Sequence, residues 1–423
     1  PAYTIHRRIY REKSFSGVEG QFNLNDNLYT DTLFMVDEAS MIANMGLGGM
    51  SFGSGCLLDD LVHFVYQGRN DRLLLIGDKA QLPPVGEEES PALHAAMLEG
   101  YGLKVYECDL NEVLRQSEES GILYNATMIR QMITHDDITQ LPKIHFAGYS
   151  DIKPMPGAEL IEALADSYHH VGLDDTIVVT RSNKRANIFN QGIRNMVLDR
   201  EEELSQGDIL MIVKNNYYWM EEERKKIKEK EIEERRVKSE GTESGTATHK
   251  VQSSKFQVQS NDIPAFLANG DRAKVLKVRR RIDLYGFRFA TLLLQFPDYG
   301  NYELEATVLL DTLTSEAPAL THEQQEQLFH QIEEDYQDIP LKADRMKAIR
   351  QDQFFNALQV KFAYAVTCHK AQGGQWAHVY VDQGYMTDDM LNPDYIHWLY
   401  TAFTRATEML YLVNWPETQT ALE

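Results

Sequence analysis

Residues 73–86, LLLIGDKAQLPPVG, read as a buried strand that ends in a polar, proline-stiffened loop. The apolar run 73–77 predicts the strand, and Asp78, Gln81 and the Pro83-Pro84 pair follow it. A loop at the carboxyl end of a parallel strand is where α/β proteins bind ligands. The stretch therefore predicts an α/β fold with a ligand site beside Gln81, although a plain turn is the alternative.

The rest of residues 1–150 alternates between strand and helix, which is the pattern of a parallel sheet. The predicted strands are 32–36, 73–76 and 103–107, and the predicted helices are 57–66 and 90–98. A second α/β segment begins with a strand at 176–179 and a helix at 184–197.

Between residues 221 and 356 the pattern changes three times. Residues 221–236 carry mixed charge and predict a solvated helical arm, followed by a linker. Residues 266–310 have a period of two and predict a small antiparallel β-module, and 321–356 predict polar helices. The α/β pattern returns at 360–366, 379–381 and 410–413, so the second α/β domain is split by an insertion.

These patterns predict the domain boundaries. We expect a first domain at 1–150, a second at 151–220 with 357–423, a charged flexible insertion at 221–260, and the β-module with its helical stretch at 261–356.

Composition limits the class of protein. Net charge is −22, which argues against a broad basic face for duplex DNA but permits a single strand in a locally basic channel. On composition alone, an acidic enzyme with no nucleic acid is favoured. The three cysteines have no metal spacing, and we find no signal peptide or apolar membrane span, so we expect a cytoplasmic protein.

An acid pair follows the strand predicted at 32–36. In LFMVDEAS (33–40), Asp37 and Glu38 lie at the carboxyl tip of that strand. One carboxylate there can hold Mg²⁺ on a nucleotide while the other orients the attacking water. A helix N-cap at Asp37 or Ser40 is the structural alternative.

Three further stretches place phosphate-binding chemistry next to predicted strands. LNEVLRQ (110–116) supplies Arg115, and LYTAFTRATEMLYLV (399–413) supplies Arg405, which could act as an arginine finger. AYAVTCHKAQGGQ (363–375) combines hydroxyl, imidazole, amide and glycine backbone. Taken singly, a lone arginine or histidine is more often a surface or core residue.

Six motifs in this order resemble those of superfamily 1 DNA helicases: YTIHRRIY (3–10), VDEAS (36–40), GDKAQLPPV (77–85), LRQ (114–116), YAVTCHKAQGGQ (364–375) and YTAFTRA (400–406). The Thr4-x-His6 element, TRSNKRANIFNQGIR (180–194) and LANGD (267–271) resemble the RecD-like branch, which includes the exonuclease V alpha subunit. The resemblance implies an α/β fold of two RecA-like parallel-sheet domains, the first truncated, with an inserted small SH3-like β-barrel module.

For ATP and Mg²⁺, the resemblance implies a role for each matching residue. Asp37 would hold Mg²⁺ and Glu38 would activate water, while Gln81 would sense the γ-phosphate. Arg115 and Arg405 would stabilise the transition state. Gln372 and Gly373 would lie near the nucleotide.

For DNA, the resemblance implies ATP-dependent movement from 5′ to 3′ along single-stranded DNA and at junctions with duplex. Thr4, His6, Thr367 and His369 would contact the strand. Residues 11–30 fall where the family places a duplex-splitting hairpin.

The sequence departs from the family at one point, since it contains no GxxxxGK[ST] phosphate loop and no Gly-Lys pair. We therefore expect a helicase fragment that hydrolyses almost no ATP alone and whose first sheet exposes apolar surface and unpaired backbone at its edge. Two alternatives stay open. One is a RecD-like subunit of a helicase–nuclease repair complex, with cutting left to a partner, and the other is a nucleic-acid-binding protein without hydrolysis.

Overall fold

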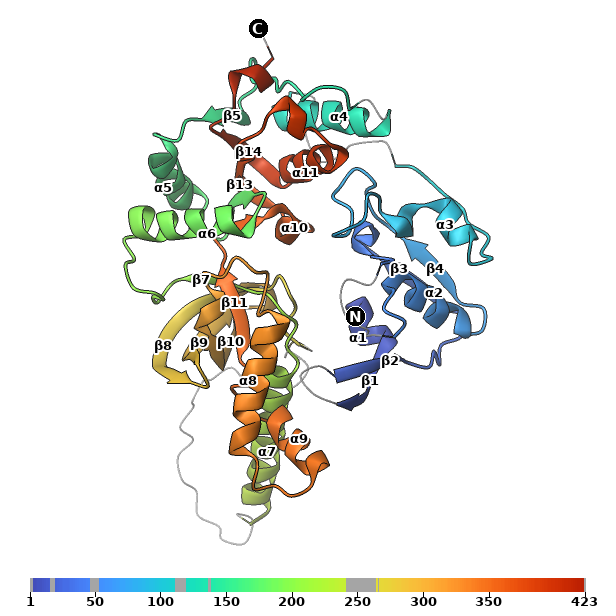
Figure 1. Ribbon diagram of the computed structural model, residues 1–423, viewed down its shortest axis with the longest axis vertical. Helices are drawn as coiled ribbons and strands as arrows, with labels where there is room; N and C mark the ends of the chain where they lie inside the picture. Colours follow the sequence, from blue (N-terminus) through green and yellow to red (C-terminus); the bar gives the residue numbers. More distant parts are fainter. Residues whose placement is uncertain are drawn as a thin grey trace. The chain divides into compact units, whose positions relative to one another are not determined.

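The chain forms two compact units, Pro1–Asp199 with Tyr364–Glu423 and Arg200–Ala363 (Figure 1). The structure is a computed structural model that describes residues 3–15, 20–45, 53–110, 119–135, 138–240, 264 and 266–421.

The first part of the first unit is built around a two-stranded parallel sheet. Strand β3 (Leu33–Val36) pairs with β4 (Arg72–Leu75), and helix α2 (Leu57–Gln67) crosses between them. The apolar side of α2, including Leu58, Leu61 and Val65, forms a core with one face of the sheet. The remaining elements are α1 (Ile5–Ile9), the antiparallel pair β1 (Tyr10–Phe15) and β2 (Gly20–Leu24), and α3 (Ala95–Glu99).

The opposite face of the β3–β4 sheet is apolar and exposed. Leu33 and Met35 are 55% and 64% exposed, and Leu74 and Ile76 are each 41% exposed. Parallel sheets are normally covered on both faces. Apolar surface is therefore exposed on a face of the first sheet, whereas the sequence predicted exposure at the sheet edge.

The second parallel sheet has the strand order β12-β6-β13-β14-β5. Its strands are β5 (Ile152–Met155), β6 (Thr176–Thr180), β12 (Ala365–Thr367), β13 (Trp376–Asp382) and β14 (Ala406–Val413). Its helices are α4 (Gly121–Thr134), α5 (Leu160–His170), α6 (Asn183–Gly192), α10 (Cys368–Ala371) and α11 (Pro393–Phe403). The predicted strands at 176–179, 379–381 and 410–413 are confirmed, and the predicted helix 184–197 becomes π-helical over Ile193–Val197.

A buried amide fixes the point where the chain returns to this sheet. Asn190 of α6 accepts hydrogen bonds from the backbone N–H groups of Tyr364 and Ala365 at 3.1 and 2.8 Å. Its Nδ2 donates to the carbonyl of Ala365 at 2.9 Å. Asn190 therefore ties α6 to the first residues of β12.

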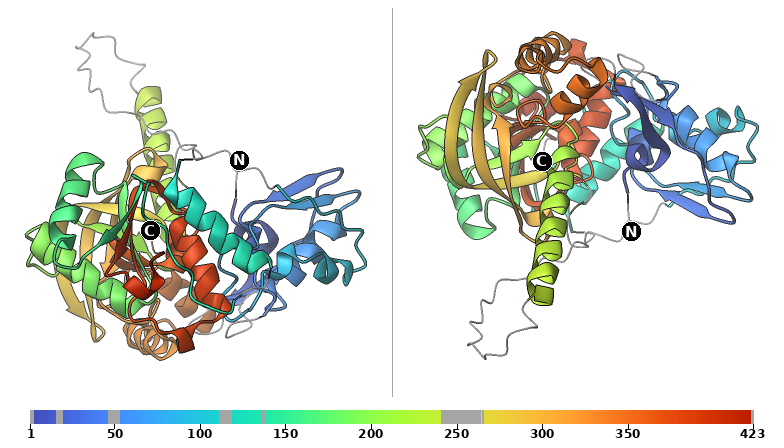
Figure 2. Two further views of the ribbon diagram at one scale, coloured as in Figure 1. Left: turned by 90° about the horizontal axis from the view of Figure 1, so that it is seen from above. Right: turned by 90° about the horizontal axis from the view of Figure 1, so that it is seen from below.

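The second unit contains a closed barrel with the strand order β10-β11-β7-β8-β9. The strands are β7 (Ile209–Ile212), β8 (Arg272–Leu284), β9 (Phe287–Phe296), β10 (Tyr302–Leu309) and β11 (Leu358–Phe362). Figure 2 shows the long strands β8 and β9 arching along one side of the barrel. The fold class is thus confirmed: an α/β chain with parallel sheets and an inserted small β-barrel.

The barrel is larger than the predicted range 261–356, because β7 and β11 belong to it. The predicted boundaries placed residues 209–212 and 358–362 in the second α/β domain, because a short strand carries too little pattern to show which sheet it joins. The predicted strand 360–366 is in fact two strands, β11 in the barrel and β12 in the parallel sheet. Strands β7 and β11 are antiparallel neighbours, and Ala363 N–H donates to the carbonyl of Ile209 at 2.9 Å.

Among its described residues, the second unit also contains three α-helices. Helix α7 (Tyr218–Glu240) extends from the barrel as a single helix (Figure 2), and α8 (His322–Asp335) and α9 (Lys342–Arg350) occupy the predicted polar helical stretch. The charged segment is thus helical up to Glu240, and residues 241–260 of the predicted flexible insertion lie outside the described residues. No described helix is long and apolar enough to cross a membrane.

Two predicted elements of the first unit differ from the structure. Residues 103–107 form no strand, because no described strand pairs with them. The predicted helix 90–98 is broken into a 3₁₀ turn, Pro91–Leu93, and the short helix α3. His94, between the two pieces, has an extended backbone (φ −96°, ψ 113°) that interrupts the helix.

We predict that Asn190→Leu lowers the free energy of unfolding by about 3 kcal/mol, because it leaves buried backbone groups of residues 364–365 without a partner. Chemical denaturation would measure the change. Lys184→Leu, at an exposed position of the same helix, is the control and should change stability by less than about 0.5 kcal/mol. Equal stability of the two variants would contradict the role of the amide.

We further predict that Met35→Lys changes stability by less than about 0.5 kcal/mol while reducing the binding of a fluorescent dye for apolar surface. Phe34→Lys is the matched control on the covered face, where Phe34 contacts Phe64 with ring centroids 5.9 Å apart. It should cost about 3 kcal/mol or more. Strong destabilisation by Met35→Lys would show that this face is covered in solution.

Candidate functional site

Glu38 follows β3 in a backbone conformation that non-glycine residues seldom adopt. Its φ and ψ are 53° and 39°, and its N–H donates to Oδ1 of Asp37 at 2.9 Å. Such outliers persist where the surrounding structure holds them, often at functional sites. A Cβ placed on Gly373 would lie 4.0 Å from Oε1 of Glu38, so the carboxylate faces the segment after α10.

The loop 77–86 begins directly beside the tip of β3. A Cβ on Gly77 would lie only 2.9 Å from the backbone nitrogen of Ser40, so a side chain does not fit there. Asp78 then turns the chain by accepting a hydrogen bond from the N–H of Ala80 at 3.0 Å. The carboxyl ends of β3 and β4 therefore meet, as the sequence predicted.

Helix α11 holds this loop through its backbone. Leu82 N–H donates to Oγ1 of Thr401 at 2.8 Å, and Thr401 in turn donates to the carbonyl of His397 at 2.8 Å. Nδ1 of His397 lies 2.9 Å from the carbonyl oxygen of Ala80, so this nitrogen carries the proton and donates. Buried hydrogen bonds of this kind restrict the loop to one position.

Asp78 anchors the start of the loop to two helices. Its carboxylate accepts from the Tyr400 hydroxyl at 2.8 Å and from Nη1 of Arg130 at 3.2 Å. Arg130, on α4, also donates to the Tyr400 hydroxyl oxygen at 3.0 Å. Burial and the negative charge of Asp78 raise the pKa of Tyr400 to about 12, so its hydroxyl stays protonated and donates.

Gln372 connects the segment after α10 to the loop. Its Nε2 lies 3.4 Å from Oε1 of Gln81, 3.2 Å from the carbonyl oxygen of Leu82 and 3.4 Å from Oγ of Ser40. Gly373, the next residue, has a φ of +81° and is exposed. Two of the predicted nucleotide-site residues, Gln81 and Gln372, are therefore in direct contact.

Arg405 is 4% exposed, and its guanidinium is held by neutral oxygens. Its nitrogens donate to the carbonyls of Thr401 and Gly374 at 2.9 and 3.1 Å, and to Oγ1 of Thr404 at 3.0 Å. Burial lowers the pKa of Arg405, while the charge of Glu38 acts in the opposite direction. Among the described residues Arg405 forms no ion pair, so its charge is available to an anion.

The structure thus gathers most of the predicted nucleotide-site residues. Gln81 contacts Gln372, while Glu38 faces Gly373 and acts electrostatically on Arg405. Asp37, the predicted metal ligand, is exposed next to Glu38. Arg115 lies outside the described residues. A carboxylate, two amides and a buried guanidinium at strand tips suit a metal-bound polyphosphate.

The residues predicted to contact DNA have separate surroundings. Thr4 caps α1 by accepting a hydrogen bond from the N–H of Arg7 at 3.4 Å. The ring centroids of His6 and Tyr10 are 5.6 Å apart. Thr367 and His369 lie at the start of α10, where Thr367 is half-buried and His369 is exposed. In the described part of the chain no hydrogen bond joins the first pair to the second, and their role in DNA binding stays a prediction. The predicted hairpin at 11–30 corresponds to β1 and β2, and residues 16–19 between them lie outside the described residues.

Sequence reasoning missed five residues that hold the site together: Ser40, Arg130, His397, Tyr400 and Thr401. Tyr400 and Thr401 fall within the motif that supplied Arg405, so their position was a usable signal. Arg130 gave none, because a lone arginine in a helix is usually a surface charge. Lys370 lies within the predicted phosphate-binding stretch 363–375 but was given no role, and burial lowers its pKa to about 8.

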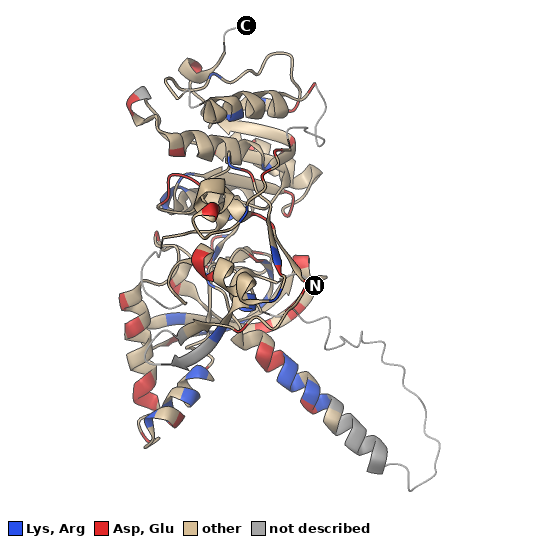
Figure 3. Cartoon of the chain, turned by 90° about the vertical axis from the view of Figure 1, so that its right-hand side faces the viewer, with Lys and Arg blue, Asp and Glu red and all other residues tan. Residues whose placement is uncertain are grey.

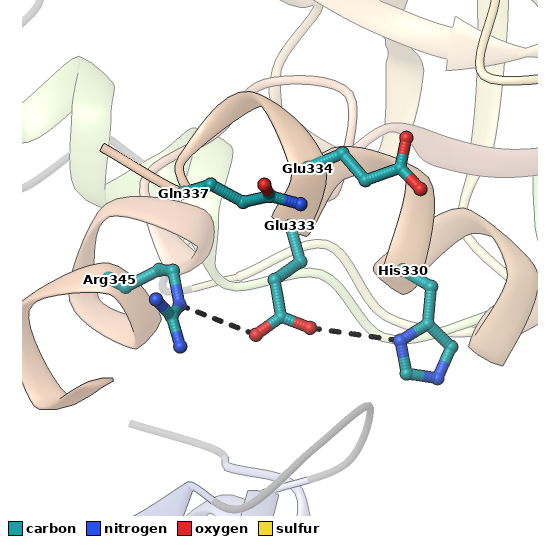
Figure 4. A pocket seen from close by; sticks show the side chains of 5 residues that line it. All are labelled: His330, Glu333, Glu334, Gln337 and Arg345. Atoms are coloured by element: carbon teal, nitrogen blue, oxygen red, sulfur yellow. Dashed lines mark ion pairs between the residues drawn. The ribbon is translucent and has the colours of Figure 1, made fainter. Parts of the chain in front are cut away.

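A cavity of about 530 Å³ lies elsewhere, between α8 and α9 of the second unit. Figure 4 shows its lining, in which Glu333 pairs with Nε of Arg345 at 3.4 Å and with Nδ1 of His330 at 3.7 Å. Its lining side chains are all polar or charged, whereas small-molecule sites are mostly apolar. None of the predicted site residues lines it.

We predict that Thr401→Val loosens the loop 77–86, because the buried N–H of Leu82 loses its acceptor. Limited trypsin digestion after the exposed Lys79 should accelerate about five- to thirtyfold, which corresponds to about 1–2 kcal/mol of local stability. Thr404→Val is the control, since among the described residues Thr404 forms hydrogen bonds with Tyr400, Thr401 and Arg405 and none with the loop. Unchanged cleavage after Lys79 in Thr401→Val would show that α11 does not hold the loop.

Comparisons with known proteins identify one part of the chain. Residues 362–413 match the model of the UvrD-like helicase C-terminal domain. This stretch contains Thr367, His369, Gln372, Gly373 and Arg405. No curated protein matches the chain.

Two Pif1 helicases are among the solved structures that resemble the chain. The crystal structure of Pif1 from Candida albicans has 12% identity and a TM-score of 0.40, and the match covers 92% of this chain and 73% of that one. The structure of Pif1 from Bacteroides in complex with ADP-AlF3 and ssDNA has 12% identity and a TM-score of 0.41, with coverage of 92% and 72%. The sequence match shows that residues 362–413 are similar to the UvrD-like helicase C-terminal domain.

Proposed function

We propose that the chain is an ATP-dependent DNA helicase or translocase of superfamily 1 that acts on single-stranded DNA. One observation carries the proposal. The residues matched by the helicase C-terminal domain supply Gln372, Gly373 and Arg405, and these converge with Glu38 and Gln81 of the first sheet. Motor proteins of this kind need nucleotide-binding residues from two sheets in one place.

The convergent residues fit Mg-ATP as the bound group. Arg405 is a buried cation held only by neutral acceptors, so an added anion would compensate its charge. In our proposal Asp37 holds the metal ion and Glu38 accepts a proton from water. Mg-ATP itself supplies the free energy of hydrolysis.

The loop 77–86 provides a route from the nucleotide to the rest of the first unit. Gln81 and Leu82 contact Gln372, while Asp78, Ala80 and Leu82 are bound by α4 and α11. A displacement of Gln81 would therefore strain hydrogen bonds to these helices. Such a loop can favour one of two states of the protein according to the nucleotide bound.

The phosphate loop is the missing component, since the sequence contains no GxxxxGK[ST]. That loop supplies most of the backbone donors and the lysine that cradle a triphosphate. We therefore propose that this chain by itself binds ATP weakly and hydrolyses almost none. The same absence favours the second candidate, a nucleic-acid-binding protein without hydrolysis. Movement from 5′ to 3′ and the RecD-like branch are proposed from the motif resemblance alone.

The test is titration of fluorescent single-stranded DNA at several salt concentrations. We expect binding that weakens steeply with salt, and about tenfold weaker binding by the double variant Thr367→Ala, His369→Ala, equivalent to about 1.4 kcal/mol. His322→Ala, an exposed histidine of α8, is the control and should bind like the parent chain. Failure of the parent chain to bind single-stranded DNA at low salt would overturn the proposed function.

A parallel assay concerns hydrolysis. We expect no ATP turnover by this chain, with or without single-stranded DNA, because the phosphate loop is absent. Measurable DNA-stimulated release of phosphate by the purified chain would contradict that expectation. It would also exclude the second candidate.

A further inference from the structure

Strand β8 is the most basic element of an otherwise acidic chain. Six of its 13 residues, RAKVLKVRRRIDL, are Lys or Arg, whereas the whole chain has a net charge of −22. Figure 3 shows that Lys and Arg (blue) are mixed with Asp and Glu (red) on α7, the other element rich in cations. A concentration of cations on a single strand is therefore a local feature.

Two irregularities in the pairing of β8 with β9 align three of these cations. The register shifts between Val275 and Lys277 and again between Val278 and Arg280, so one extra residue is accommodated at each place. As a result Lys274, Lys277 and Arg280 stand opposite Gln295, Leu293 and Thr291 of β9. In a regular strand, side chains three residues apart would point to opposite faces.

The pattern of burial shows which face the three cations occupy. Val275 and Val278 stand opposite Leu294 and Leu292, which are fully buried in the barrel. The alternate positions of β9, at 291, 293 and 295, are only half-buried, and the three cations opposite them are exposed. Lys274, Lys277 and Arg280 therefore form a row on the outer face, which we call the β8 cation row.

The spacing within the row is regular. Successive members are two ladder positions apart, which at about 3.3 Å per residue is about 7 Å. Neighbouring phosphates along an extended nucleic-acid strand have a comparable separation. A regular row of this kind suits a polyanion whose charges repeat at a fixed interval.

The other cations of β8 already have partners. Arg279 pairs with Glu305 at 2.5 Å, and Arg281 donates to the carbonyl of Leu204 at 2.8 Å and to Glu202 at 3.3 Å. In contrast, no ion pair or hydrogen bond engages the side chains of the β8 cation row within the described part of the chain. The row is thus a set of uncompensated charges.

Acidic side chains on the same face lie farther away, on β10. Glu303 and Glu305 stand opposite Gln295 and Leu293 of β9, so one uncharged strand separates them from the β8 cation row. Glu305 is neutralised by Arg279. The basic character of the outer face is therefore confined to β8, where a narrow linear ligand could lie along the strand.

We propose that the β8 cation row binds the phosphate backbone of a nucleic acid, as a contact on the barrel additional to the candidate site of the first unit. The inference rests on the proposed function, because that function supplies the nucleic acid. A single strand and a duplex present the same phosphate chemistry, and separate titrations distinguish them. The β9 residues beside the row, Thr291, Leu293 and Gln295, are uncharged, so the row offers charge along a line, which suits a phosphate backbone.

The experiment compares two triple variants of the full chain. Lys274→Gln, Lys277→Gln, Arg280→Gln removes the row. Lys153→Gln, Lys342→Gln, Lys347→Gln removes three exposed cations from β5 and α9 and gives the same net charge. All six side chains are exposed, so both variants should unfold like the parent chain, which circular dichroism would check.

For single-stranded DNA, loss of three phosphate contacts should reduce the slope of log K against log salt by about 2 and weaken binding about tenfold at low salt. For blunt duplex the slope should fall by about 3 if duplex is the ligand. The control variant should retain the parent slope in both titrations. A larger effect in one arm identifies the form of nucleic acid that the row binds.

Three results would overturn the inference. In the first, the row variant binds both nucleic acids with the affinity and salt slope of the parent chain. In the second, the control variant loses as much DNA affinity as the row variant. The row variant could also lose binding of polyglutamate while keeping its DNA affinity, which would identify an acidic protein as the partner. If DNA binding then still depends on Thr367 and His369, the proposed function stands. If the parent chain binds no DNA, both the proposed function and the role of the β8 cation row are refuted.

Discussion

The buried hydrogen bond from Leu82 N–H to Thr401 is the contact on which the arrangement of the first unit depends. It belongs to a loop that starts at the tip of one parallel sheet and ends against helices that cover the other. Asp78, shared between Arg130 and Tyr400, fixes the beginning of that loop, and Pro83-Pro84 stiffen its end. With both ends held, Gln81 has little freedom except to lie beside Gln372. Residues of the candidate site that come from distant parts of the sequence are brought together by this one loop.

The residues that follow β3 and β4 could be predicted from the sequence, but the helix residues that hold them in place could not. Asp37, Glu38 and Gln81 follow apolar runs whose carboxyl ends meet in any parallel sheet, so their proximity followed from pattern and topology. Arg130 is a single arginine in a helix, and only the fold shows that it faces Asp78. The strands β7 and β11 were misassigned for a related reason. A strand of four or five residues contains too little pattern to show which sheet it joins.

Arg405 and the β8 cation row differ in their exposure to water. Arg405 is desolvated, and burial lowers its pKa, so a ligand there would meet a fixed and poorly hydrated charge. The β8 cation row is hydrated, and each of its contacts would be weakened by salt. The first setting favours strong orientation of a small, highly charged group. The second favours a contact that forms and breaks readily along a polymer.

The adjacency of β7 and β11 bears on how the chain reaches its native state. Strand β6 must pair with β12, although residues 200–363 separate them in sequence, and closing a flexible segment of that length costs about 4–5 kcal/mol in chain entropy. If the barrel folds first, the hydrogen bond from Ala363 N–H to the Ile209 carbonyl joins the start and the end of the insertion. Most of the entropy cost of closing the segment has then been met before β6 pairs with β12. A folded barrel would then bring the later strands of the parallel sheet close to the earlier ones during synthesis.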